Sequence, residues 1–190
     1  MRPLLASLLL STSLVLLANT PSVAAETPLW KGAKWIWDKA GAQTNDSRYL
    51  RRRFQLADKP TAAKIHITVD NAYTLFVNGK KVGGDDDWSD VEEYDITKLL
   101  TKGTNVLAID ARNAGGKAAA ICWMKITASD KSETIIGTDD TWLVSLAKTE
   151  SWQEPDFDEA NWSKAVAIGS PDASPWNITG KKPSPAAAAP

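Results

Sequence analysis

The side chains best suited to chemistry lie in a short acidic stretch, residues 85–90, which reads Asp-Asp-Asp-Trp-Ser-Asp. Carbohydrate sites combine an aromatic ring, which stacks on the apolar face of a pyranose, with carboxylates and amides that hydrogen-bond to hydroxyl groups. Trp88 beside Asp86 and Asp87 supplies both kinds of group. The stretch therefore predicts either a ligand-binding loop or a solvated turn in which Trp88 folds back onto the protein.

Three residues outside this stretch are further candidates for ligand contact. Asn71 follows an expected strand, and Asn113 precedes a loop that contains Gly115-Gly116. Loops on a rigid scaffold collect binding groups, although asparagine also fixes turns through its own backbone. Trp123 lies on the strand face opposite Cys122, where its ring is either exposed or packed under a neighbouring loop.

No residue pattern in the chain is typical of catalysis. His66 is the single histidine, and there is no Gly-x-Ser-x-Gly motif. Adjacent acids such as Asp139-Asp140 fall in turn-like stretches, whereas a glycosidase needs two carboxyl groups ~5 to 10 Å apart across a cleft. We therefore expect a protein that is not an enzyme, with no catalytic residues.

The same acidic stretch raises the question of a metal. Three adjacent aspartates do not reproduce the alternating ligands and terminal glutamate of an EF-hand loop. We assign no metal ligands and expect no cofactor, and a structural calcium ion remains the open alternative.

Composition and the first residues indicate where the protein works and what it does not bind. Residues 1–25 have the charged start, apolar middle and small-residue end of an export signal, which predicts a secreted or periplasmic protein. The 22 basic and 23 acidic residues form no basic block, so nucleic acid is not an expected partner. A single cysteine, Cys122, allows no internal disulfide, and its apolar neighbours predict a buried thiol.

Strand signals run through the rest of the chain. Residues 65–70 alternate strictly and predict a strand with Ile65, Ile67 and Val69 inward and with His66 and Thr68 outward, facing solvent. Asn78-Gly79 between apolar runs predicts a hairpin, because both turn positions need positive φ. The remaining expected strands are residues 33–37, 49–56, 105–113 and 118–128, with a further hairpin formed by 133–137 and 142–145.

The expected exceptions to this strand pattern are few. Residues 96–100 predict a single helical turn, and 152–162 predict another whose aromatic residues cap the fold. Three arginines, at 51, 52 and 53, divide between the two faces of a strand that is expected to be solvated or at a sheet edge. Residues 180–190, rich in proline and alanine, predict a disordered tail.

The whole pattern favours an all-β protein, an antiparallel β-sandwich or jelly roll with one or two short helical turns, spanning residues 26–179. At residues 49–54, 70–79, 94–108, 139–142, 157–162 and 175–176 the sequence resembles galactose-binding-like jelly rolls. More narrowly, it is similar to the non-catalytic sugar-binding modules of bacterial α-L-rhamnosidases, β-galactosidases and β-glucuronidases. The catalytic barrel of those enzymes is not part of the resemblance.

This resemblance implies a secreted, non-catalytic module that binds carbohydrate or glycan through loops at one end of the sandwich. Trp88, Asp86, Asp87, Asn71, Asn113 and Trp123 are the expected contact residues. An alternative function is a structural or protein-interaction module that binds an exported protein partner. A third, an accessory part of a glycoside hydrolase, requires an enzyme beside it.

Overall fold

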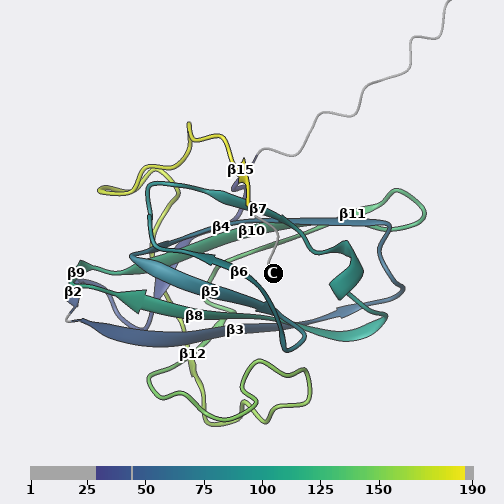
Figure 1. Cartoon of the computed structure of the whole chain (residues 1–190), viewed down its shortest axis with the longest axis horizontal. Coiled ribbons are helices and arrows are strands. Elements are labelled where there is room, and N and C mark those ends of the chain that lie inside the picture. Colours follow the sequence, from purple (N-terminus) through teal and green to yellow (C-terminus); the bar gives the residue numbers. More distant parts are fainter. Residues whose placement is uncertain (1–28, 44, 187–190) are drawn as a thin grey trace, which may run out of the picture.

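The computed structural model describes residues 29–43 and 45–186. In that part of the chain, two stacked β-sheets form a sandwich, seen edge-on in Figure 1. The first sheet runs in the order β14 (Val166–Gly169), β1 (Trp35–Trp37), β10 (Ala119–Thr127), β4 (Ala62–Asp70), β7 (Glu92–Asp95) and β15 (Ser184–Pro185), and β11 (Glu133–Gly137) also pairs with β10. The second sheet runs in the order β13 (Ser163–Lys164), β12 (Leu143–Ser145), β3 (Asp46–Leu56), β8 (Gly103–Asn113), β5 (Ala72–Val77) and β6 (Lys80–Asp85).

Two small elements complete the fold. β2 (Ala42–Gln43) pairs with β9 (Gly116–Lys117) at one end of the sandwich, and a 3-10 turn, η1 (Thr97–Leu99), follows β7. All pairings are antiparallel except that of β15 with β7. No helix in the described ranges is long and apolar enough to cross a membrane. The all-β sandwich with a short helical turn is therefore confirmed.

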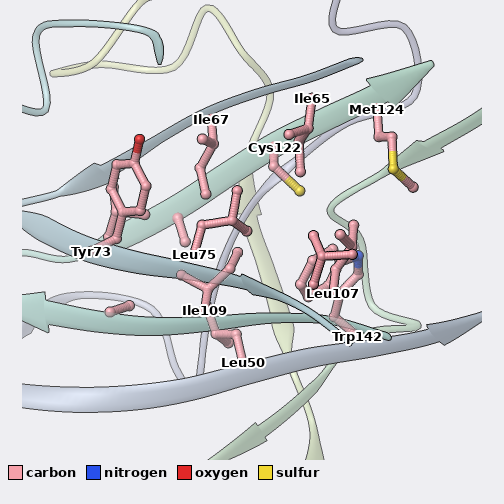
Figure 2. Packing of buried hydrophobic residues seen from close by; sticks show 14 of the residues in the cluster. Leu50, Ile65, Ile67, Tyr73, Leu75, Leu107, Ile109, Cys122, Met124 and Trp142 are labelled. Carbon is pink, nitrogen blue, oxygen red and sulfur yellow. The ribbon is translucent and has the colours of Figure 1, made fainter. Parts of the chain in front are cut away.

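The main core fills the space between the two sheets (Figure 2). Alternate residues of β4, Ile65 and Ile67, point toward Leu75 of β5 and Ile109 of β8 on the facing sheet. Cys122 lies among them and is fully buried, and burial raises the pKa of its thiol. The inert buried cysteine expected from the sequence is therefore confirmed.

The Asn78-Gly79 hairpin forms as predicted between β5 and β6. Both turn residues have positive φ, 49° and 78°. Asn78 also joins the turn to the core, because its Nδ2 donates to Asn105 Oδ1 at 2.8 Å and its Oδ1 accepts from Val106 N at 2.8 Å. β4 and β5 do not pair with each other: they lie in opposite sheets and face each other across the core.

A second apolar layer covers the outer face of the first sheet. It contains Trp30, Ala33, Trp35, Val91, Ala119, Ile121, Trp123, Trp176 and Ile178. This layer corrects the expectation that His66 and Thr68 face solvent, because His66 is 8% and Thr68 1% exposed. β4 is thus buried on both faces, and the alternation in its sequence describes only the inner one.

The outer face of the second sheet is covered by residues 146–162, the segment below β12 in Figure 1. Trp152 packs there on Val106 and Ala108 of β8. The segment consists of turns and contains no helix, so the predicted helical turn is wrong. The prediction of a solvated or edge strand for residues 49–56 is wrong for residues 49–51, since Arg51 is completely buried and β12 pairs with this part of β3. It holds for residues 52–56, which pair with β8 alone.

Two further expectations differ from the structure. β11 pairs with β10 in the first sheet and β12 pairs with β3 in the second, so residues 133–145 cross between sheets and form no hairpin. Ser184–Pro185 pairs with β7 rather than lying in a tail without structure. Residues 1–25, the expected export signal, lie outside the described residues.

Candidate functional site

Most of the candidate residues gather at one end of the sandwich, the end that carries β2 and β9 (Figure 1). We call this the loop end and define it by residues 70–72, 86–91, 113–118 and 173–177. The strand registers bring these loops together, because Asp70 pairs with Ala119 and Ala72 with Arg112. The loop 86–91 joins β6 to β7 at the same end, since the last residue of β6 pairs with Tyr73 at the start of β5.

A buried carboxylate lies at the centre of the loop end. Asp70 is 7% exposed, and its Oδ2 accepts a hydrogen bond from Trp176 Nε1 at 2.8 Å. Burial raises the pKa of Asp70, and the hydrogen bond from Trp176 acts in the opposite direction. Among the described residues, Oδ1 of Asp70 has no hydrogen-bond partner, so one oxygen remains as an acceptor.

Asn71 and Asn113 hold the neighbouring loop. Asn71 Oδ1 accepts from Ala114 N at 2.7 Å, and Asn113 Oδ1 accepts from Gly115 N at 2.9 Å. Asn113 is fully buried, so it shapes the loop from inside. Asn71 is partly exposed, and within the described ranges its Nδ2 has no partner. Of the two, Asn71 presents a donor that a ligand can use.

The acidic stretch forms a sequence of tight turns. Asp85 Oδ2 accepts from Asp87 N at 3.0 Å, and Asp87 Oδ1 accepts from Ser89 N at 2.8 Å. Hydrogen bonds from the side chain and backbone of Ser89 lower the pKa of Asp87. Asp86 is exposed, with no partner among the described residues. Two of these aspartates thus build the loop, whereas Asp86 faces solvent unpaired.

Trp88 is partly buried and packs against the second apolar layer. Its carbonyl accepts from Thr68 Oγ1 at 2.9 Å, which ties the acidic loop to β4. Lys181 Nζ lies 5.4 Å from the centre of the ring and also donates to Ser89 O. The ring is therefore a partly covered wall of the loop end, rather than an open platform.

Trp123 is remote from the loop end. It pairs with His66 in the middle of β4, stacks on that histidine at 5.7 Å and is 4% exposed. Its two ring faces are covered in this structure, which resolves the alternative of an exposed or packed Trp123 in favour of packing.

Two features of the loop end were not singled out from the sequence. Trp176 is buried against Trp35, with ring centroids 4.7 Å apart, although the Pro175-Trp176 pair belonged to the family pattern. Beside it, Lys117 Nζ donates to Ser174 O at 3.2 Å across a cavity of about 190 Å³. This volume is below the ~300 to 1,000 Å³ typical of drug-sized sites and suits one small ring.

An ion-pair network anchors β3 at the same end. Arg48 is buried, with Nε 2.7 Å from Asp38 Oδ1 and Nη2 2.9 Å from Asp46 Oδ2. The sequence offered no signal for this network, because Asp38 lies ten positions from Arg48. In the described part of the chain, no group of three or more His, Cys, Asp or Glu side chains is placed to hold a metal ion.

Comparisons with known proteins connect this fold to carbohydrate-active proteins. No family model matches the chain. An α-L-rhamnosidase from Streptomyces avermitilis is 31% identical in an alignment of 170 residues that covers 83% of this chain and 16% of that enzyme. An α-L-rhamnosidase from an Alteromonas species is 23% identical over 74% of this chain. The chain spans 16 to 21% of the length of the curated relatives it matches.

Solved structures give the same result. The crystal structure of the Streptomyces avermitilis α-L-rhamnosidase complexed with L-rhamnose matches 80% of this chain with a TM-score of 0.73 and 31% identity, over 16% of the enzyme. A lectin from Pleurotus ostreatus in complex with GalNAc matches 82% of this chain with a TM-score of 0.76 and 33% identity, over 47% of the lectin. The chain is therefore a β-sandwich similar to one region of α-L-rhamnosidases and to part of a lectin, which is consistent with the galactose-binding-like module that its sequence resembles.

Proposed function

We propose that this chain is a non-catalytic carbohydrate-binding module that recognises a sugar at its loop end. The observation that carries the proposal is the similarity to a lectin in complex with GalNAc, which extends over 82% of this chain at 33% identity. The similarity to one small region of α-L-rhamnosidases supports it, because that region is 16% of the Streptomyces enzyme.

The loop end offers the polar groups that such recognition needs. Asn71 Nδ2 can donate to a sugar hydroxyl, and Asp70 Oδ1 and the exposed Asp86 can accept from one. The partly exposed ring of Trp88 supplies an apolar wall for the C–H groups of a pyranose. Three kinds of contact thus converge on one small region, as in other sugar sites.

The export signal expected in residues 1–25 belongs to this proposal, since a glycan-binding module acts where polysaccharides are. Processing after Ala25 would place the protein outside the cytoplasm. Mass spectrometry of the protein recovered from the periplasm or the medium tests this, and an intact N-terminus in a cytoplasmic fraction would contradict it.

The Asn71→Asp substitution tests sugar recognition with little disturbance of the loop. An aspartate keeps the oxygen that accepts from Ala114 N, replaces the Nδ2 donor with a second acceptor oxygen and adds a negative charge, which the control below also adds. We expect L-rhamnose or GalNAc to bind the unmodified protein in calorimetry and Asn71→Asp to weaken that binding about tenfold or more.

The control is Asn161→Asp, which changes an exposed asparagine on the segment that covers the second sheet. It should leave affinity unchanged. Titrations in EDTA and with added Ca²⁺ would reveal a structural calcium ion, if one contributes. Equal binding by Asn71→Asp would contradict the role of the loop end, and a failure of both sugars to bind would favour a protein-interaction module.

A further inference from the structure

A second cavity, lined by polar residues, borders the loop end at Ala72 and lies on the outer face of the second sheet. It has a volume of about 210 Å³ and is lined by Ser47, Ala72, Tyr73, Thr74, Asp110 and Arg112. These residues come from β3, β5 and β8, three strands that are neighbours in the sheet (Figure 1). We call it the Arg112 hollow.

The strand registers place four polar side chains of the hollow on one face of the sheet, with Arg112 and Asp110 on the central strand and Ser47 and Thr74 on the strands to either side. Arg112 pairs directly with Ser47 on β3, and Asp110 pairs directly with Thr74 on β5. Directly opposite residues have Cβ atoms ~4.5 to 5.5 Å apart and point to the same face. Asp110 and Arg112 are two positions apart on β8, so their side chains share that face with a separation of ~7 Å.

The Arg112 side chain makes no polar contact that stabilises the described part of the fold. Its side chain is exposed, and no hydrogen bond or ion pair involves its guanidinium within the described ranges. The contrast with its neighbours is clear, because Arg48 and Arg51 are both buried and paired with carboxylates. A guanidinium with five unused donors at the rim of a cavity matches the geometry of a carboxylate.

One carboxylate oxygen of Asp110 already forms an ion pair with a lysine. Lys148 Nζ lies 3.2 Å from Asp110 Oδ2, and the same ammonium group lies 5.9 Å from the ring centre of Tyr49. The other oxygen of Asp110 has no described partner and can accept a hydrogen bond. The hydroxyl groups of Ser47 and Thr74 have none either. The hollow thus has the Arg112 guanidinium on one side, and on the other side it has groups that can hydrogen-bond to hydroxyl groups.

We propose that the Arg112 hollow binds a sugar that carries a carboxylate, such as the uronate unit of an acidic glycan. The Arg112 fork binds the carboxylate through two parallel hydrogen bonds, and Asp110, Thr74 and Ser47 bind ring hydroxyls. Compact anions such as phosphate fit less well, because they carry no ring hydroxyl groups for Asp110, Thr74 and Ser47 to bind. This site borders the proposed neutral-sugar site but uses different binding groups, so either can bind while the other fails.

The test is an NMR titration of the ¹⁵N-labelled protein with D-galacturonate and D-glucuronate, with D-galactose and inorganic phosphate as comparisons. We expect saturable shifts of the amide signals of residues 47, 74, 110 and 112 with a uronate. Galactose and phosphate should bind at least about tenfold more weakly than the uronate. Arg112→Gln should reduce uronate affinity about tenfold, and Arg112→Lys should reduce it less, because it keeps the charge without the fork.

The matched control is Lys59→Gln, which removes an exposed cation without a described partner at the other end of the sandwich. It should leave uronate affinity unchanged. Equal affinity for galactose and a uronate, tighter binding of phosphate, or unchanged binding by Arg112→Gln would each overturn the proposal. So would the lack of any saturable shift with both uronates.

Discussion

Arg51 and Glu159 form an ion pair between the second sheet and the segment that covers it, with 2.7 Å between Arg51 Nε and Glu159 Oε2. The guanidinium is completely buried, and its Nη1 donates to Trp152 O at 2.5 Å. It also lies 5.1 Å from the ring centre of Phe157. One side chain of β3 thus holds residues 152–159 against the sheet through charge, hydrogen bonding and cation–π contact.

Removing the carboxylate should destabilise the protein markedly. Glu159→Ala leaves the buried Arg51 charge without its counter-ion, a change that costs about 3 kcal/mol or more in comparable sites. Urea denaturation followed by tryptophan fluorescence measures the free energy of unfolding. Glu150→Ala, at an exposed glutamate nearby, is the control and should change it by less than about 0.5 kcal/mol. Equal losses of unfolding free energy in the two variants would contradict a stabilising role of the Arg51–Glu159 ion pair.

Asp70 should make stability depend on pH. Because burial raises its pKa in the folded protein, the folded state binds more protons than the unfolded state at pH values just above ~4. The contribution of Asp70 to the free energy of unfolding therefore falls as pH rises through that interval. Asp70→Asn lacks this effect. The free energy of unfolding of the variant minus that of the unmodified protein should therefore increase between pH 4 and pH 7. Denaturation at several pH values checks the sign, and a constant or decreasing difference would contradict it.

Gly79 in the β5–β6 hairpin should resist substitution for a backbone reason. Its φ of 78° is costly for a residue with a side chain, and an added Cβ would meet the carboxylate of Glu154. The end of Glu154 can move aside, so the backbone sets most of the cost. We expect Gly79→Ala to lower the free energy of unfolding by about 1 to 2 kcal/mol. Gly180→Ala, with open space around it and no positive φ, should be neutral. A neutral Gly79→Ala would show that the turn adapts freely.

Trp88 should contribute to sugar affinity through its apolar ring. Trp88→Phe keeps an aromatic wall at the loop end, whereas Trp88→Ala removes it. In titrations with L-rhamnose and GalNAc we expect near-original affinity for the first variant and a loss of about three- to tenfold for the second. Circular dichroism establishes that both variants fold. If Trp88→Ala binds as tightly as the original protein, Trp88 serves only to pack the loop.

The parts of the fold that depend on local patterns could be predicted from sequence. The alternation around Ile65 and the Asn78-Gly79 turn act over a few residues, and both predicted elements are present. The environment of His66 could not be predicted, because the layer over it includes Trp176, more than one hundred positions away. Arg51 was misjudged for the same reason, since its partner Glu159 comes from a distant covering segment.

The candidate site divides in a similar way. Asn71 and the acidic loop were found from residue type and their position near strand ends, and the strand registers bring them to one end of the sandwich. The hydrogen bond between Asp70 and Trp176 joins residues far apart in the chain, and no local pattern indicates it. The sequence places Trp123 on a strand but does not determine its exposure, because the layer that covers it includes residues far away in the chain.

The most direct test of the proposed function is a map of where a neutral sugar binds. ¹⁵N-labelled protein is titrated with L-rhamnose and with GalNAc, and amide shifts are followed across the described residues. We expect saturable shifts confined to the loop end, at residues 70–72, 86–91, 113–118 and 173–177. Saturable shifts at the opposite end, around residues 57–60 and 128–132, or no saturable shifts with either sugar, would contradict it.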